Sequence, residues 1–124
     1  MMNTIYERLG DTLLMQLIDE FYKNILANPV TSPLFKTDME IVKKKQFYFL
    51  TQFFGGPLRY VEAYGHPMMR ARHMPHHIDE EAAVQWLSCM NQAIDSLPIN
   101  EDFKAEIFNR FPPVAAHMIN QPSL

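Results

Sequence analysis

The chain has 124 residues, and we expect one domain over residues 1–124. Its formal net charge of −3 excludes the concentrated positive field of a nucleic-acid-binding surface, so we expect no nucleic-acid partner. Cys89 is the only cysteine, which excludes an intrachain disulfide. There is no run of about 18 apolar residues to span a bilayer, and no basic stretch followed by a long apolar run at the start. We therefore expect a cytoplasmic protein without a membrane partner.

The first predicted element is a short helix over residues 5–9. Thr4 and Glu7 have the spacing of a capping box, in which each side chain satisfies a backbone N–H of the other residue. Gly10 follows as a left-handed stop, because glycine adopts a positive φ without a steric penalty. The sequence therefore predicts a break at Gly10.

A longer helix is predicted from residue 12 to about residue 27, with Asp11 as its N-cap. Tyr22 lies four positions after one apolar residue and three before another, so its side chain is predicted to point inward. The apolar residues recur at steps of three and four and form one stripe: Leu13, Leu14, Leu17, Ile18, Phe21 and Ile25.

A connector with two prolines, residues 28–38, separates this helix from the next. Thr37 or Asp38 caps a helix that runs to about residue 54. Its inward face is predicted to comprise Met39, Val42, Gln46, Phe49, Leu50 and Phe53. Gln46 interrupts an otherwise apolar row, and such a local inconsistency often marks a site.

The sequence "GGP" at 55–57 ends that helix, and one or two helical turns are predicted within 58–64. A short helix is then predicted from Pro67 to about Met74, because proline suits the first turn of a helix. Pro75 stops it.

Asp79 is predicted to cap the next helix, whose stripe is Ala83, Trp86, Leu87, Met90, Ala93, Ile94 and Leu97. Asn100 begins the last helix, which Pro112 and Pro113 should kink or split. The apolar side of this last helix comprises Phe103, Ile107, Phe108, Phe111, Ala115 and Met118. No strand-like alternation or repeat is present, so the fold class is predicted to be all-α.

Three histidines cluster in "RARHMPHHI" at 70–78: His73, His76 and His77. Three imidazoles could converge on a metal ion, but Pro75 interrupts the helix that would align His73 with His77, and no recognised zinc spacing is present. An imidazolium at a helix C-terminus is also stabilised by the helix dipole and needs no other role. On these grounds alone the role of His73 stays open.

Tyr22, Gln46 and Trp86 are polar groups predicted to face inward from three separate helices. A buried tyrosine or tryptophan usually finds one hydrogen-bond partner and otherwise contributes bulk. A buried amide left unpaired costs about 1–3 kcal/mol, so Gln46 needs a protein partner or a ligand. Either explanation is open from the pattern alone.

Four segments together resemble the bacterial truncated haemoglobins of the second group: "DEFYKNI" at 19–25, "FLTQFFGGP" at 49–57, "YGHPMMRARH" at 64–73 and "WLSCM" at 86–90. The similarity extends from "YERLG" near the start to "HMIN" at 117–120. The resemblance implies a truncated globin-like two-over-two helical sandwich around haem b. His73 would be the proximal ligand of the iron, and His76 and His77 would be bystanders. Attachment would be noncovalent, because no CxxCH motif is present.

The resemblance also implies roles for the residues around the haem. Tyr22, Gln46 and Trp86 would surround and stabilise the distal ligand. The implied haem contacts are Phe35, Val42, Lys45, Phe49, Met69 and Arg72. Of these, Lys45 and Arg72 match basic positions that meet the propionates, and Val42 replaces the distal histidine of larger globins.

The function implied is reversible, high-affinity binding of dioxygen and related diatomics, rather than bulk transport. Carbon monoxide, nitric oxide or peroxide are further expected ligands. Two alternatives remain: a haem enzyme with peroxidase-like or nitric-oxide dioxygenase activity, which would need an unidentified reductase, and a haem-free, globin-shaped signalling module. We expect a monomer or weak dimer.

Overall fold

The computed structural model describes residues 3–35, 38–65 and 78–119, and these residues are helical apart from their connections. The helices are α1 (Ile5–Ala27), α2 (Met39–Phe53), α3 (Arg59–Tyr64), α5 (Glu80–Asp95), α6 (Glu101–Phe108) and α7 (Pro112–Met118), with a 3₁₀ turn η1 (Ser32–Leu34). Within these ranges there is no strand, which agrees with the all-α prediction. The helix predicted from Pro67 to Met74 lies outside the described residues.

The start of α1 forms as the sequence predicts. The Thr4 side chain accepts a hydrogen bond from the Glu7 N–H at 3.1 Å, and the Glu7 carboxylate accepts one from the Thr4 N–H at 3.1 Å. Gly10 has a φ of 79° and kinks the helix. A short first helix thus continues into a longer one at a different angle.

The predicted N-cap role of Asp11 is wrong. Its carboxylate accepts hydrogen bonds from the Tyr6 hydroxyl at 2.7 Å and from the Arg59 guanidinium at 3.2 Å. The three side chains join the first turns of α1 to α3, and this longer-range arrangement replaces the local cap.

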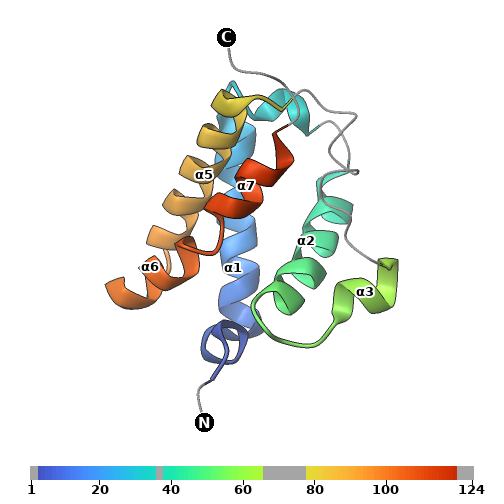
Figure 1. Cartoon of the computed structure of the whole chain (residues 1–124), viewed down its shortest axis with the longest axis vertical. Helices are drawn as coiled ribbons and strands as arrows, with labels where there is room; N and C mark the ends of the chain where they lie inside the picture. The colour runs from blue at the N-terminus through green and yellow to red at the C-terminus, as the bar shows by residue number, and fades with distance from the viewer. Residues whose placement is uncertain (1–2, 36–37, 66–77, 120–124) are drawn as a thin grey trace.

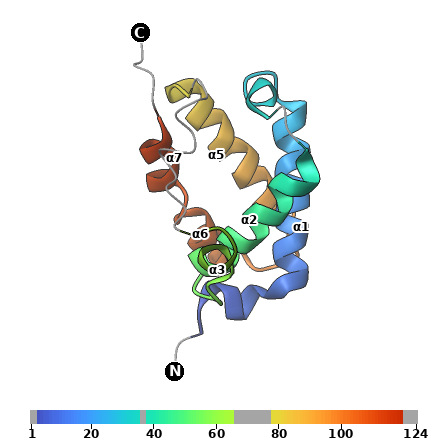
Figure 2. The same cartoon turned by 90° about the vertical axis from the view of Figure 1, so that its right-hand side faces the viewer.

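The helices form two facing pairs, as the two-over-two arrangement requires. Helix α1 packs against α2 and α5, and α5 also packs against α6 and α7. Figure 2 shows α1 with α2 on one side and α5 with α7 on the other, while α3 lies beside the end of α2 (Figure 1). The core between them includes the fully buried Leu14, Leu17, Ile18, Phe21, Ile25, Met90 and Ile94.

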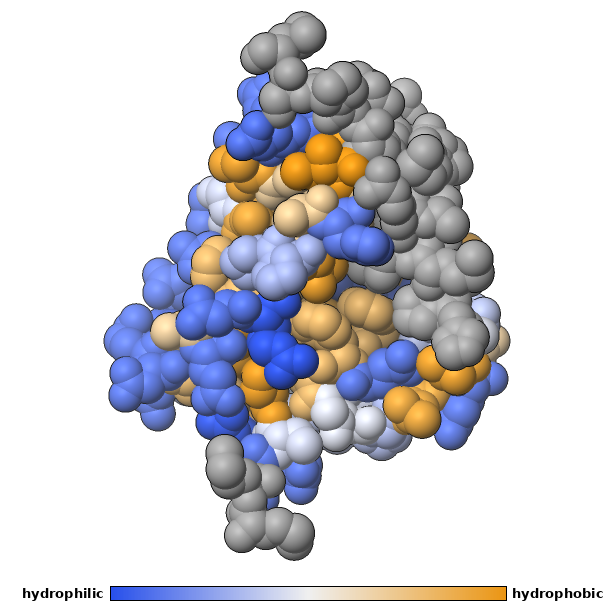
Figure 3. Space-filling model, viewed as in Figure 1, coloured by the Kyte–Doolittle hydropathy of each residue, from blue (hydrophilic) through white to orange (hydrophobic). Residues whose placement is uncertain are grey.

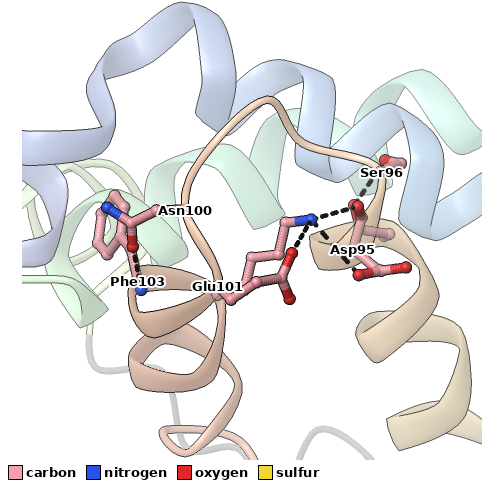
Figure 4. A network of polar contacts seen from close by, with 7 residues as sticks. Asp95, Ser96, Asn100, Glu101 and Phe103 are labelled. Atoms are coloured by element: carbon pink, nitrogen blue, oxygen red, sulfur yellow. Dashed lines mark hydrogen bonds and ion pairs between the residues drawn. The ribbon is translucent and has the colours of Figure 1, made fainter.

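Side-chain caps fix where three later helices begin. Asp38, Asp79 and Asn100 accept hydrogen bonds from backbone N–H groups in the first turns of α2, α5 and α6. At the turn between α5 and α6, the Lys104 ammonium donates to the Asp95 carbonyl at 2.9 Å and to the Glu101 carboxylate at 3.1 Å (Figure 4). This cation satisfies a carbonyl at the C-terminus of α5, where a positive charge is favourable.

The two prolines near the end split the last helix. Helix α6 ends at Phe108 and α7 begins at Pro112, while the Phe111 side chain between them is buried. Proline is accommodated at the start of α7 because the first N–H groups of a helix have no intrahelical partner. None of the described helices is both long and apolar enough to cross a membrane.

Candidate functional site

An apolar cavity lies among side chains from both helix pairs and from α3. Seven residues that the resemblance assigns to the site line it: Tyr22, Phe35, Val42, Lys45, Gln46, Phe49 and Trp86. The structure thus brings together every assigned residue that it describes. Apolar side chains are visible at the surface between α7 and α2 in Figure 3.

Four lining residues were not assigned from the sequence: Tyr60, Phe111, Val114 and Met118. Phe111 and Met118 were predicted to face the core, but no sequence signal separates a core position from a cavity wall. Tyr60 lies within the predicted turns at 58–64, where the segment was too short to define an inward face. The α7 residues show that the split last helix still supplies one wall of the cavity.

Aromatic packing holds Tyr22 and Trp86 in place. The Tyr22 ring meets Phe21 and Phe35 edge-on, with centroid distances of 4.9 and 5.7 Å. Trp86 makes similar contacts with Phe21 at 5.2 Å and Phe111 at 5.8 Å. Such edge-to-face contacts restrict the orientation of each ring and hence the direction of its polar group.

The polar groups of Tyr22, Gln46 and Trp86 make no hydrogen bond to any residue that the structure describes. In the described residues, every side-chain nitrogen or oxygen atom that is fully buried has a hydrogen-bond partner. The three groups therefore reach the open volume of the cavity. Because unpaired polar groups are costly in apolar surroundings, this arrangement fits a bound ligand that accepts hydrogen bonds.

Burial raises the pKa of the Tyr22 phenol well above its ordinary value of 10.0. Only 4% of the residue's surface is exposed, so the charged phenolate would lose most of its hydration. The Tyr22 hydroxyl consequently keeps its proton throughout the neutral range and can act as a hydrogen-bond donor.

Lys45 places a cation at the cavity. Its ammonium lies 5.4 Å from the centroid of the Tyr64 ring, and it forms no ion pair with a carboxylate of the described residues. An ammonium that forms no ion pair with these residues can bind an acidic group of a ligand. The cavity therefore offers apolar walls, three polar groups inside and one positive charge.

Three assigned residues, Met69, Arg72 and His73, lie outside the described residues, as does the histidine cluster. Among the residues that the structure does describe, no group of three or more His, Cys, Asp or Glu side chains could hold a metal ion. The proximal role of His73 therefore stays a prediction.

The chemistry of the lining suits haem, which has an apolar ring system and two carboxylates. Aromatic and aliphatic side chains match the ring, and Lys45 matches a carboxylate. The volume enclosed by the described residues is about 180 Å³. Residues 66–77, which include His73, lie outside the described ranges.

Comparisons with known proteins agree with this geometry. The chain matches the bacterial-like globin family over residues 4–120. It is 44% identical over 119 residues to the group 2 truncated hemoglobin YjbI of Bacillus subtilis, covering 96% of this chain and 90% of that protein.

Two solved structures superpose on all or nearly all of the chain. The group II truncated hemoglobin of Bacillus anthracis superposes with a TM-score of 0.94 at 39% identity, covering 100% of this chain and 96% of the other. A truncated oxygen-avid haemoglobin from Bacillus subtilis superposes with a TM-score of 0.89 at 43% identity, covering 95% of this chain and 100% of the other.

Proposed function

The chain belongs to the bacterial-like globins, and within them to the group II truncated haemoglobins, and from this premise we propose that it binds noncovalent haem b through His73 and retains dioxygen with high affinity. The observation that carries the proposal is the set of three polar side chains, Tyr22, Gln46 and Trp86, that line one apolar cavity without a hydrogen-bond partner among the described residues. A relative of known structure is named oxygen-avid, which supports the same ligand here.

Haem, when bound, would supply an iron to which a diatomic ligand can attach. The Tyr22 hydroxyl, the Trp86 indole N–H and the Gln46 amide would then donate hydrogen bonds to the ligand. These bonds are strongest when the acceptor carries partial negative charge, and dioxygen is the expected ligand that haem would polarise most. The donors therefore favour dioxygen over carbon monoxide, which accumulates less charge.

The remaining residues would orient the cofactor. Phe35, Val42 and Phe49 would present apolar surface to the ring, while Lys45 and Arg72 would pair with its carboxylates. Val42 has no group that could bind a metal ion, so this position would not compete with a small ligand for the iron.

Absorption spectroscopy and ligand kinetics test the proposal. Haem titrated into the purified chain should give a Soret band that saturates at one haem per chain. Trp86→Phe should accelerate dioxygen dissociation, because it removes one donor. No Soret band would overturn haem binding and favour the haem-free signalling alternative, whereas an unchanged dissociation rate would overturn the proposed role of Trp86.

A further inference from the structure

Three tyrosines form a continuous line of ring contacts that leads away from the cavity. Tyr60, on α3, is 6% exposed and lines the cavity wall. Its ring centroid lies 5.1 Å from that of Tyr64, which in turn lies 6.0 Å from that of Tyr48 on α2. Tyr64 and Tyr48 are both half-buried, so the line ends at solvent.

Phenols can release one electron and one proton and are among the most readily oxidised side chains. The ring contacts that lead from Trp86 differ, because they pass to Phe21 and Phe111, whose rings are much harder to oxidise. Phe111 continues only to further phenylalanines, Phe53 and Phe54, in the part of the chain described. The tyrosine line is therefore the better path for single electrons.

Two lysines add positive charge where this line approaches the surface. The Lys44 ammonium lies 5.8 Å from the Tyr48 ring centroid, and the Lys45 ammonium lies 5.4 Å from that of Tyr64. Neither lysine forms an ion pair with a carboxylate that the structure describes. Lys45 would pair with a carboxylate of the bound haem, so on a chain with a formal net charge of −3 Lys44 is the local positive charge that can attract a small anion.

We propose that Tyr60, Tyr64 and Tyr48 form a tyrosine relay, which carries electrons from a small anionic reductant beside Lys44 to a peroxide that is reduced in the cavity. This inference rests on the proposed function, because bound haem would supply the peroxide chemistry in the cavity. The protein would then act as a peroxidase whose reductant need not enter the cavity.

One hydrogen peroxide takes up two electrons and two protons and becomes two waters. Each electron supplied by Tyr60 is replaced from Tyr64 and then from Tyr48, whose phenolic proton passes to solvent. An enediol anion of the ascorbate class returns one electron and one proton to Tyr48 and leaves as a radical anion. Two reductant anions are consumed for each peroxide.

The test uses the haem-loaded full-length chain, with hydrogen peroxide and no reductant. We expect a tyrosyl radical by electron paramagnetic resonance of frozen samples, and dityrosine-linked dimers joined through Tyr48 by mass spectrometry. Tyr64→Phe keeps the ring but removes the oxidisable phenol, so it should abolish oxidation of Tyr48. Tyr6→Phe is the matched control, because Tyr6 has no ring contact with the relay, and it should leave Tyr48 oxidation unchanged.

Ascorbate provides a second readout. Lys44→Glu should raise the KM for ascorbate by about threefold to tenfold at low ionic strength, and high salt should remove the difference. With uncharged hydroquinone as reductant, the same variant should match the parent chain. An equal change with both reductants would overturn the role of charge in the reductant site.

Spectra recorded before each reaction separate the two proposals. Absence of a Soret band would overturn haem binding and the relay together. A normal Soret band that responds to peroxide, with Tyr48 oxidised as much in Tyr64→Phe as in the parent chain, would overturn the relay alone.

Discussion

Removing the Tyr22 hydroxyl tests a single proposed hydrogen bond, the one from this hydroxyl to the bound ligand. Tyr22→Phe keeps the ring that packs against Phe21 and Phe35 at 4.9 and 5.7 Å, and deletes a single oxygen. That oxygen makes no hydrogen bond to a described residue, so no partner there is left unpaired. A change in ligand release would therefore report the bond between Tyr22 and the ligand.

The expected magnitude follows from the strength of such a bond. A hydrogen bond to a charged acceptor contributes about 1.5–3 kcal/mol. At about 1.4 kcal/mol per factor of ten, its loss should accelerate dioxygen dissociation roughly tenfold to 150-fold. Because burial raises the pKa of Tyr22, the hydroxyl stays protonated, and the acceleration should be the same at every neutral pH.

Stopped-flow displacement of dioxygen by carbon monoxide measures this rate directly. Tyr48→Phe is the control, because it deletes a phenol that does not line the cavity and should leave the dissociation rate unchanged. If Tyr22→Phe released dioxygen at the rate of the parent chain, the assignment of Tyr22 as a donor would be refuted.

Three further predictions concern stability. Gly56→Ala should lower the free energy of unfolding by about 1–3 kcal/mol in urea titrations, because the new Cβ would lie 2.5 Å from the Tyr6 ring; an unchanged midpoint would contradict this packing. The pKa of Asp11 is lowered by its hydrogen bonds from Tyr6 and Arg59, so its contribution is present above pH 3.8 and is lost as the pH falls below that value. On acidification, Asp11→Asn should therefore lose less free energy of unfolding than the parent chain, by less than about 1 kcal/mol because the Asp11 side chain is exposed. If both chains lost the same free energy of unfolding at acid pH, that result would argue against these contacts. The raised pKa of Tyr22 stabilises the folded state below pH 10, and this contribution is lost as the pH rises above 10. In thermal unfolding at alkaline pH, Tyr22→Phe should therefore lose less stability than the parent chain.

The sequence predicts the helix starts well because their signals are local. Thr4 with Glu7, Asp38, Asp79 and Asn100 each cap the helix expected of them. Asp11 is the instructive exception, since contacts with Tyr6 and Arg59 outcompete the local cap. A short-range pattern carries no information about that competition.

The candidate site likewise contains residues that the sequence indicates and residues that it does not. Gln46 was conspicuous as a polar residue on an apolar stripe, and it does line the cavity. Tyr60 could not be identified, because whether an aromatic side chain fills the core or borders a cavity depends on how α3 docks on α2. The resemblance supplied the residue roles, whereas the residue pattern supplied the inward-facing polar groups.

Every proposed ligand-binding role depends on a bond from His73 to the haem iron, and optical spectra of His73→Gly with and without added imidazole test this bond. In the parent chain, the ferrous spectrum should be that of five-coordinate haem with an imidazole ligand. The variant should lose this spectrum and recover it when free imidazole is added. A variant that binds haem with the spectrum of the parent chain, without added imidazole, would contradict the assignment.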